Sequence, residues 1–254
     1  MLSFAVMFKR FLLLVVIVSP LSGPGVHSDE TASSQRLVFG SLPCKDDSNP
    51  RSLGVRQLAW ELVKRTSIEA EPESRDVDPS DVAIFETPFL FWSCKGAVAP
   101  LDEKAKSNLR RFLKLGGFLL VDDPSSSKTS DFSISVRNAI GEILPEKEFS
   151  EIPGDHVLFK TFFLISRPFG RVANSRLESV SVGDRLAVVY SANDLLGAMN
   201  RDFYGNWEHA CQPGGEIQRE ESIRLGINIV FYAMCLDYKD DRVHLPFILK
   251  RRRL

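Results

Sequence analysis

Two adjacent carboxylates follow an apolar run near the middle of the chain. Asp122 and Asp123 come directly after Phe118-Leu-Leu-Val121. Carboxylates so placed suit a hard cation such as Mg²⁺ or Ca²⁺, or one shared proton used in acid–base chemistry. The competing interpretation is that one aspartate caps the following turn while the other faces solvent. The pair is the first candidate catalytic or metal site, and the metal itself is unknown.

A second group of polar residues surrounds His209. The stretch 193–218 is rich in glycine and polar residues, and it contains Asn193, Asp194 and Trp207 as well as the histidine. Loops of that length in a compact domain tend to be functional or mobile. We therefore expect His209 to act with the aspartate pair as a catalytic group, and Asn193, Asp194 and Trp207 to bind a ligand.

The other histidines and the motif searches favour structural roles. His156 precedes an apolar run and His244 lies beside Pro246, whereas His27 falls in the N-terminal leader. The sequence contains no H-E-x-x-H, no G-x-S-x-G, no P-loop and no dinucleotide G-x-G-x-x-G. The sequence does not identify a cofactor, so the cofactor is unknown.

Strands and helices alternate through the first half of the chain. Apolar runs predict strands at 36–42, 89–93 and 118–121, and apolar residues at helical spacing predict helices at 54–65 and from 102 to 115. This order indicates an α/β fold with a parallel sheet and right-handed crossovers. The short charged segment 68–78 suits an edge strand or an extended connection.

The remaining elements are less regular. Further strand-like apolar runs occur at 82–85 and 157–165, and helices are predicted at 130–144 and 219–235. Gly183-Asp184 separates two more apolar runs, at 177–182 and 185–191, and predicts an antiparallel hairpin added to the sheet.

Three loops are expected to meet at the carboxyl ends of the parallel strands, where open α/β sheets bind ligands. They bring Cys94 and Lys95, which we name as ligand-binding candidates, close to Cys44, Asp46 and Asp47. Cys44 and Cys94 either form a disulfide or remain two free thiols, and a bridge requires Cα atoms within about 7 Å of each other.

The N-terminus resembles an export signal. Lys9-Arg10 precede an eight-residue apolar run, Phe11–Val18, and a small-residue exit at Val26-His27-Ser28. The run would rise only about 12 Å as a helix, so a stable transmembrane span is not expected. We expect a signal peptide at 1–28, cleaved before Asp29; the alternatives are an uncleaved anchor and a buried strand.

The predicted organisation continues with a disordered linker at 29–35, an α/β domain at 36–249 and a basic tail at 250–254. Removing the signal leaves 30 basic and 33 acidic side chains, a net charge of −3. Such a balance does not indicate nucleic-acid binding. The tail either touches an anionic membrane surface or is solvated.

Five segments together resemble a bacterial domain family of unknown function grouped with the class I glutamine amidotransferase-like superfamily. They are Pro88–Trp92, the Leu-Arg-Arg-Phe-Leu-x-x-Gly-Gly-Phe-Leu-x-x-Asp-Asp pattern at 109–123, Asp155-His156, Gly226–Ala233 and Val243–Pro246. The resemblance covers most of residues 36–253. It implies a flavodoxin-like, mostly parallel sheet with helices on both faces.

The resemblance implies no established activity. Active enzymes of that superfamily carry a nucleophilic cysteine on the sharp turn after a central strand, and here that turn holds Asp122-Asp123-Pro124. Two hypotheses remain: a non-catalytic, exported domain that binds an unknown ligand or protein of the cell envelope, periplasmic in a double-membrane bacterium, and a hydrolase of a polar envelope substrate that uses the aspartates with a histidine or metal. A hydrolase requires the carboxylate and the imidazole to converge in one pocket.

Overall fold

A seven-stranded sheet organises the protein in a computed structural model that describes residues 36–46, 49–127, 129–173 and 176–234. The strand order is β2-β1-β3-β4-β7-β6-β5. The first five of these pair in parallel, and β6 pairs antiparallel with both β7 and β5. The strands are β1 (Phe39–Ser41), β2 (Arg75–Asp76), β3 (Phe89–Trp92), β4 (Phe118–Asp122), β5 (Ser150–Glu151), β6 (Leu177–Val182) and β7 (Arg185–Ser191). The predicted α/β, flavodoxin-like class is confirmed.

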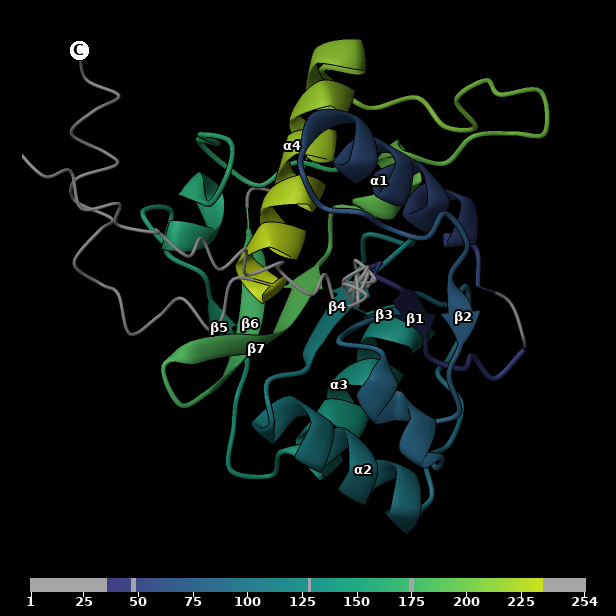
Figure 1. Ribbon diagram of the computed structural model, residues 1–254, viewed down its shortest axis with the longest axis vertical. Helices are drawn as coiled ribbons and strands as arrows, with labels where there is room; N and C mark the ends of the chain where they lie inside the picture. Colours follow the sequence, from purple (N-terminus) through teal and green to yellow (C-terminus); the bar gives the residue numbers. More distant parts are fainter. Residues whose placement is uncertain (1–35, 47–48, 128, 174–175, 235–254) are drawn as a thin grey trace, which may run out of the picture. The chain divides into compact units, whose positions relative to one another are not determined.

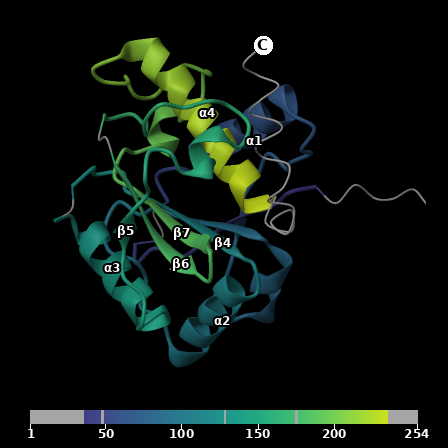
Figure 2. The same cartoon turned by 90° about the vertical axis from the view of Figure 1, so that its left-hand side faces the viewer.

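Four α-helices in the described part of the chain cover the sheet on both faces. They are α1 (Ser52–Arg65), α2 (Glu103–Lys114), α3 (Asp131–Ile143) and α4 (Gly215–Met234). Helices α1 and α4 lie on one face and α2 and α3 on the other, as the two views show (Figures 1 and 2). Each strand therefore contributes to two cores, because successive side chains point to opposite faces. In β3, Phe89 and Phe91 enter the core beneath α1 and α4, whereas Leu90 and Trp92 enter the other.

Local signals set the ends of α2. The Asp102 carboxylate accepts a hydrogen bond from the backbone N–H of Ala105 and caps the first turn. Gly116 follows the helix with φ 117°, a conformation that favours glycine, and the chain turns directly into β4. The predicted helix and strand therefore meet as the sequence indicates.

The predicted hairpin is present, and its second strand belongs to the parallel part of the sheet. Gly183 turns β6 into β7 with φ 62°. Strand β7 then pairs in parallel with β4, Leu119 with Val188 and Asp122 with Ser191. The hairpin is thus part of the main sheet: β7 lies directly beside β4, and β6 lies on the other side of β7.

Two strand predictions are wrong. Residues 82–85 belong to a 3₁₀ helix, η1 (Val82–Glu86), and the run at 157–165 begins with another, η2 (Val157–Lys160). The Asp81 carboxylate caps the first by accepting from Ala83 N–H, and His156 Nδ1 accepts from Leu158 N–H at the start of the second. Side-chain capping of the first turn outweighs the apolar composition, because backbone donors satisfied locally need no sheet partner.

The chain termini carry several of the sequence predictions. The predicted signal peptide, the linker at 29–35, the basic tail and His244 lie outside the described residues. Within the described ranges, no helix has the length and apolar character needed to cross a membrane.

Candidate functional site

A row of buried polar side chains crosses the carboxyl edge of the sheet. Asp122 pairs with Ser191, and Ser93 lies one residue beyond the Trp92–Val121 pair, beside Asp122. Strand alternation directs these three side chains toward the face covered by α1 and α4. All three are at most 1% exposed, and Ser93 Oγ has no hydrogen-bond partner among the described residues. Asp122 and Ser191, by contrast, accept hydrogen bonds from the loop after β7, as buried polar groups usually do.

Asp122 is held as a cap. Its two carboxylate oxygens accept hydrogen bonds from the backbone N–H groups of Leu195 and Leu196, both at 2.8 Å. These groups begin the short helix η3 (Leu196–Ala198). Burial, followed by the negative charge of Asp194, raises the pKa of Asp122 to about 7, although the two N–H donors and Arg51 oppose the shift. The carboxyl joins β4 to the loop after β7.

We expect this carboxyl to make stability depend on pH. Because the folded state binds the Asp122 proton more tightly than the unfolded state does, this group's contribution to the free energy of unfolding falls as pH rises from about 4 to about 7. The slope is up to about 1.4 kcal/mol per pH unit. Urea unfolding of wild type and Asp122→Asn between pH 4 and pH 8 measures it as the difference between the two proteins.

The variant should gain stability relative to wild type as pH rises through that window. Asp155→Asn, in which an exposed carboxylate is removed, serves as the matched control and should show no such trend. A difference between wild type and Asp122→Asn that is independent of pH would contradict this assignment.

Asp123 organises the turn between β4 and α3. Its carboxylate accepts from Ser125 N–H and Oγ–H, from Ser130 Oγ–H and from the Tyr190 hydroxyl at 2.9 Å. Ser130 in turn caps α3 by accepting from Ser133 N–H. The competing interpretation from sequence is that one aspartate caps the following turn while the other faces solvent. Asp123 does cap the turn, whereas Asp122 is buried and does not face solvent.

Asp194 is the centre of a buried ion-pair cluster. Its carboxylate accepts two hydrogen bonds from Arg51, Nε at 2.6 Å and Nη2 at 2.8 Å, and a third from Arg171 Nε. Asp194 itself is fully buried and has φ 51°, the left-handed conformation that aspartate and asparagine tolerate best. A fork-shaped pair of this kind fixes geometry as well as charge. The cluster anchors the loop after β7 to the start of α1.

Helix α1 reaches the loop through a glycine. A Cβ at Gly54 would lie 2.3 Å from the Leu196 carbonyl oxygen, so only glycine permits this approach. The turn before α1 is also fixed, because Arg51 N–H donates a hydrogen bond to Asn49 Oδ1.

His209 lies at the outer side of the cluster. Arg51 Nη1 approaches His209 Nε2 at 3.2 Å, and because the guanidinium is always a donor, Nε2 must accept. Burial, followed by the positive charge of Arg51, lowers the pKa of His209 below its usual range. The imidazole is therefore neutral with its Nε2 lone pair engaged, a poor arrangement for a general base. Among the described contacts, none joins His209 directly to Asp122 or Asp123.

Cys44 and Cys94 form a disulfide, with Cα atoms 5.6 Å apart. Around the disulfide, the loop after β1 pairs with the loop after β3. Cys44 and Val98 form an antiparallel β-bridge, and Lys45 N–H donates to the Ala97 carbonyl. The paired loops cover the carboxyl ends of β1 and β3. At this point the strand order reverses, and flavodoxin-like sheets usually bind ligands in a crevice there. Cys94 is completely buried, whereas Lys95 is exposed on the loop.

Trp207 is a structural support for its loop. The guanidinium of Arg201 lies 3.6 Å from the ring centroid and that of Arg219 lies 4.4 Å from it. Cation–π contacts of this kind fix an aromatic ring in place. Asn193 is buried, and its Nδ2 donates to the Arg176 carbonyl.

The stretch 193–218 divides into two parts with different environments. Residues 193–200 are all buried, whereas most of 201–210 is exposed. The exposed part lies beside α1 and lines a groove of about 470 Å³ with it. The prediction of a single polar loop therefore missed that its first third is core.

Sequence reasoning also missed Arg51 and Arg171, the partners of Asp194. Arg51 is 143 residues from Asp194 and sits in a turn-rich segment with no charge pattern to mark it. From sequence, Ser125–Ser127 is interpreted as a flexible loop rather than a nucleophile; in the structure Ser126 has φ 57° in the turn after β4, and its buried Oγ has no partner among the described residues. Only tertiary contacts identify these groups.

The described residues include no group of three or more His, Cys, Asp or Glu side chains placed to hold a metal ion. The oxygens of Asp122 and Asp123 face different backbone and hydroxyl donors. The donor set for a hard cation, which needs several oxygens around one point, is not assembled there.

Comparison with known proteins places the chain in a family. No curated protein matches it. A family model matches residues 38–234, which cover β1 to the end of α4 and thus the whole sheet. The chain belongs to the family described as "Domain of unknown function (DUF4159)".

Proposed function

We propose that this protein is an exported, amidotransferase-like domain without catalytic activity that binds a ligand or partner in the cell envelope. The observation that carries the proposal is the state of the two carboxylates after β4. Asp122 and Asp123 are fully buried, and internal hydrogen bonds occupy both carboxylates. A nucleophile or base must reach its substrate, so the complete burial of these carboxylates supports a role without catalysis.

The histidine supports the same conclusion. Hydrolysis by Asp122 or Asp123 with His209 requires the two groups to converge on one pocket. No described contact joins His209 to either of these aspartates; Arg51 instead meets His209 Nε2 on one side and pairs with Asp194 on the other. His209 Nε2 thus lies 3.2 Å from Arg51 Nη1 and 3.7 Å from the Glu208 carboxylate, and among the described residues it contacts neither of the two aspartates after β4.

Absence of turnover is the first test. The purified protein is incubated with glutamine and with a p-nitrophenyl ester series, and we expect release of ammonia or nitrophenol no faster than for Asp123→Asn or His209→Gln. A fluorophosphonate probe is used in parallel, because Ser126 has a left-handed backbone conformation after β4. Turnover that His209→Gln abolishes, or labelling that Ser126→Ala abolishes, would establish a hydrolase instead.

Export is tested separately. Expression with the native N-terminus in a double-membrane bacterium, followed by fractionation and mass spectrometry, should yield a protein that begins near Asp29 in the periplasmic fraction. A full-length chain in the membrane fraction would indicate the uncleaved anchor. A full-length chain in the cytoplasm would contradict export.

A further inference from the structure

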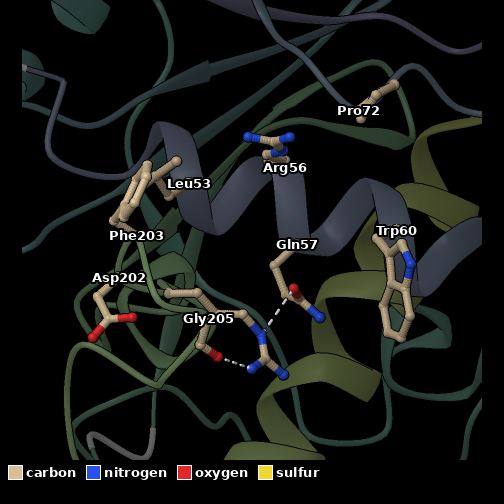
Figure 3. A pocket seen from close by; sticks show the side chains of 9 residues that line it. Leu53, Arg56, Gln57, Trp60, Pro72, Asp202, Phe203 and Gly205 are labelled. Carbon is tan, nitrogen blue, oxygen red and sulfur yellow. Dashed lines mark hydrogen bonds between the residues drawn. The ribbon is translucent and has the colours of Figure 1, made fainter.

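A groove lies between α1 and the exposed loop segment 201–205 that follows β7. Most of its residues come from α1 and from the loop after β7, two segments far apart in sequence, and Pro72 adds to them from a third segment (Figure 3). Phe203 lies beside Leu53 at one end, and Trp60 lies further along the same helix. The volume of about 470 Å³ is in the range of small-ligand sites. The groove thus has the dimensions of a binding site.

Exposed aromatic rings mark the groove. Trp60 is 51% exposed and Phe203 is 97% exposed, and the next residue, Tyr204, is also exposed. Large apolar side chains grouped on a surface mark interaction sites, because their exposure opposes stability. The Lys64 ammonium lies 4.5 Å from the Trp60 ring centroid.

The groove carries charges of both signs. The Asp202 carboxylate accepts from Tyr204 N–H, Asn206 N–H and Asn206 Nδ2, so it serves its own turn. Arg56 pairs with Glu73 at 3.3 Å. Because positive and negative groups line the groove together, it does not favour a strongly anionic or a strongly cationic ligand.

Arg201 is likewise engaged. It donates from Nε to Gln57 Oε1 at 3.1 Å and from Nη1 to the Gly205 carbonyl, in addition to its contact with Trp207. The bond to Gln57 ties the loop to α1 before any ligand binds, and the other two contacts hold the loop itself in shape. Dashed lines mark the two hydrogen bonds in Figure 3. Preorganisation of this kind lowers the entropic cost of binding.

Hydrogen-bonding capacity nevertheless remains between the rings. A guanidinium carries five N–H donors, and the Glu73 carboxylate, whose Oε1 lies 3.3 Å from Arg56 Nε, cannot use all of them. Gln57 uses one N–H toward Glu61 and one lone pair toward Arg201, which leaves one donor and one acceptor position. The groove thus combines neutral polar groups with flat apolar surfaces.

We propose that this groove binds a neutral saccharide chain. A sugar ring presents an apolar C–H face and a rim of hydroxyl groups, so it can stack on Trp60 or Phe203 while its hydroxyls bond to Arg56 and Gln57. A strongly charged ligand would meet groups of its own sign in this groove, and a purely apolar ligand would leave the polar groups unpaired. The proposal rests on the proposed function, since the saccharide is bound and not cleaved.

Calorimetric titration of the full chain with three neutral tetrasaccharides tests the proposal. The probes are tetra-N-acetylchitotetraose, cellotetraose and maltotetraose. We expect saturable binding of at least one, and an affinity at least about tenfold lower in Trp60→Ala and in Phe203→Ala, which corresponds to the loss of about 1.4 kcal/mol. Phe85→Ala is the matched control, because Phe85 is a partly exposed aromatic residue that does not line this groove.

Three results would overturn the saccharide site: no binding of any probe, binding that Trp60→Ala and Phe203→Ala leave unchanged, or an equal loss in Phe85→Ala. Circular dichroism of each variant confirms folding, which these exposed substitutions should not disturb. Chromatography of the sugar after incubation separates the two proposals. Shortened products would refute the non-catalytic function while an intact sugar bound elsewhere would refute only the groove.

Discussion

Replacement of Asp194 by asparagine is expected to lower the free energy of unfolding by about 3–5 kcal/mol, since it breaks a buried ion pair by removing one partner. Arg51 and Arg171 would remain beside a neutral amide, and Arg51 is nearly inaccessible to water. Asparagine has the same shape and tolerates φ 51°, so backbone strain does not contribute. The measurement is urea unfolding at pH 7, followed by circular dichroism.

Asp155→Asn provides the control for this prediction. It makes the same chemical change at an exposed position, where substitutions usually alter stability by less than about 0.5 kcal/mol. If Asp194→Asn were equally mild, the two arginines would not depend on this carboxylate, and the cluster would not anchor the loop. We also expect Asp194→Asn to weaken any ligand binding at the groove, because the same loop forms its wall.

Removal of the Cys44–Cys94 disulfide is expected to have an effect of similar size. The bridge spans 50 residues. The loop-closure entropy of the unfolded chain corresponds to about 4 kcal/mol for a span of this length. The double variant Cys44→Ala/Cys94→Ala should therefore unfold at a lower urea concentration than the oxidised protein, and dithiothreitol should lower the wild-type midpoint toward that of the variant.

The reductant supplies the internal control. It should leave the double variant unchanged, whereas Cys211→Ala, which alters a buried free thiol, should retain the full response to dithiothreitol. Equal midpoints for oxidised and reduced wild type would show that the bridge contributes nothing. The disulfide joins the loops that follow β1 and β3. Its loss should therefore also speed hydrogen exchange of the backbone N–H groups at the carboxyl ends of these two strands.

The sequence determined most of the scaffold through local physics. Continuous apolar runs predicted β3 and β4, since strands buried on both faces must be apolar throughout. Helical spacing predicted α1 and α2, and a turn signal predicted the β6–β7 hairpin. The runs at 82–85 and 157–165 failed because each has a capping side chain, Asp81 or His156, that favours a helical turn.

The candidate site was only partly accessible from sequence. Asp122, Asp194 and His209 were named, and all three belong to one connected network. Their roles were not evident, because a carboxylate at a strand end is equally consistent with chemistry and with capping until its donors are known. Two backbone N–H groups from residues 195 and 196 decide that Asp122 is a cap.

By itself, then, the sequence determined the α/β class, the order of most elements and which polar residues fall at the carboxyl edge of the sheet. Only the tertiary structure decided that Arg51 meets Asp194 across 143 residues, and that α1 and the loop after β7 share a groove. The physical reason is range. Periodicity and caps are set by neighbours along the chain, whereas ion pairing and groove shape depend on residues that only the folded sheet brings together.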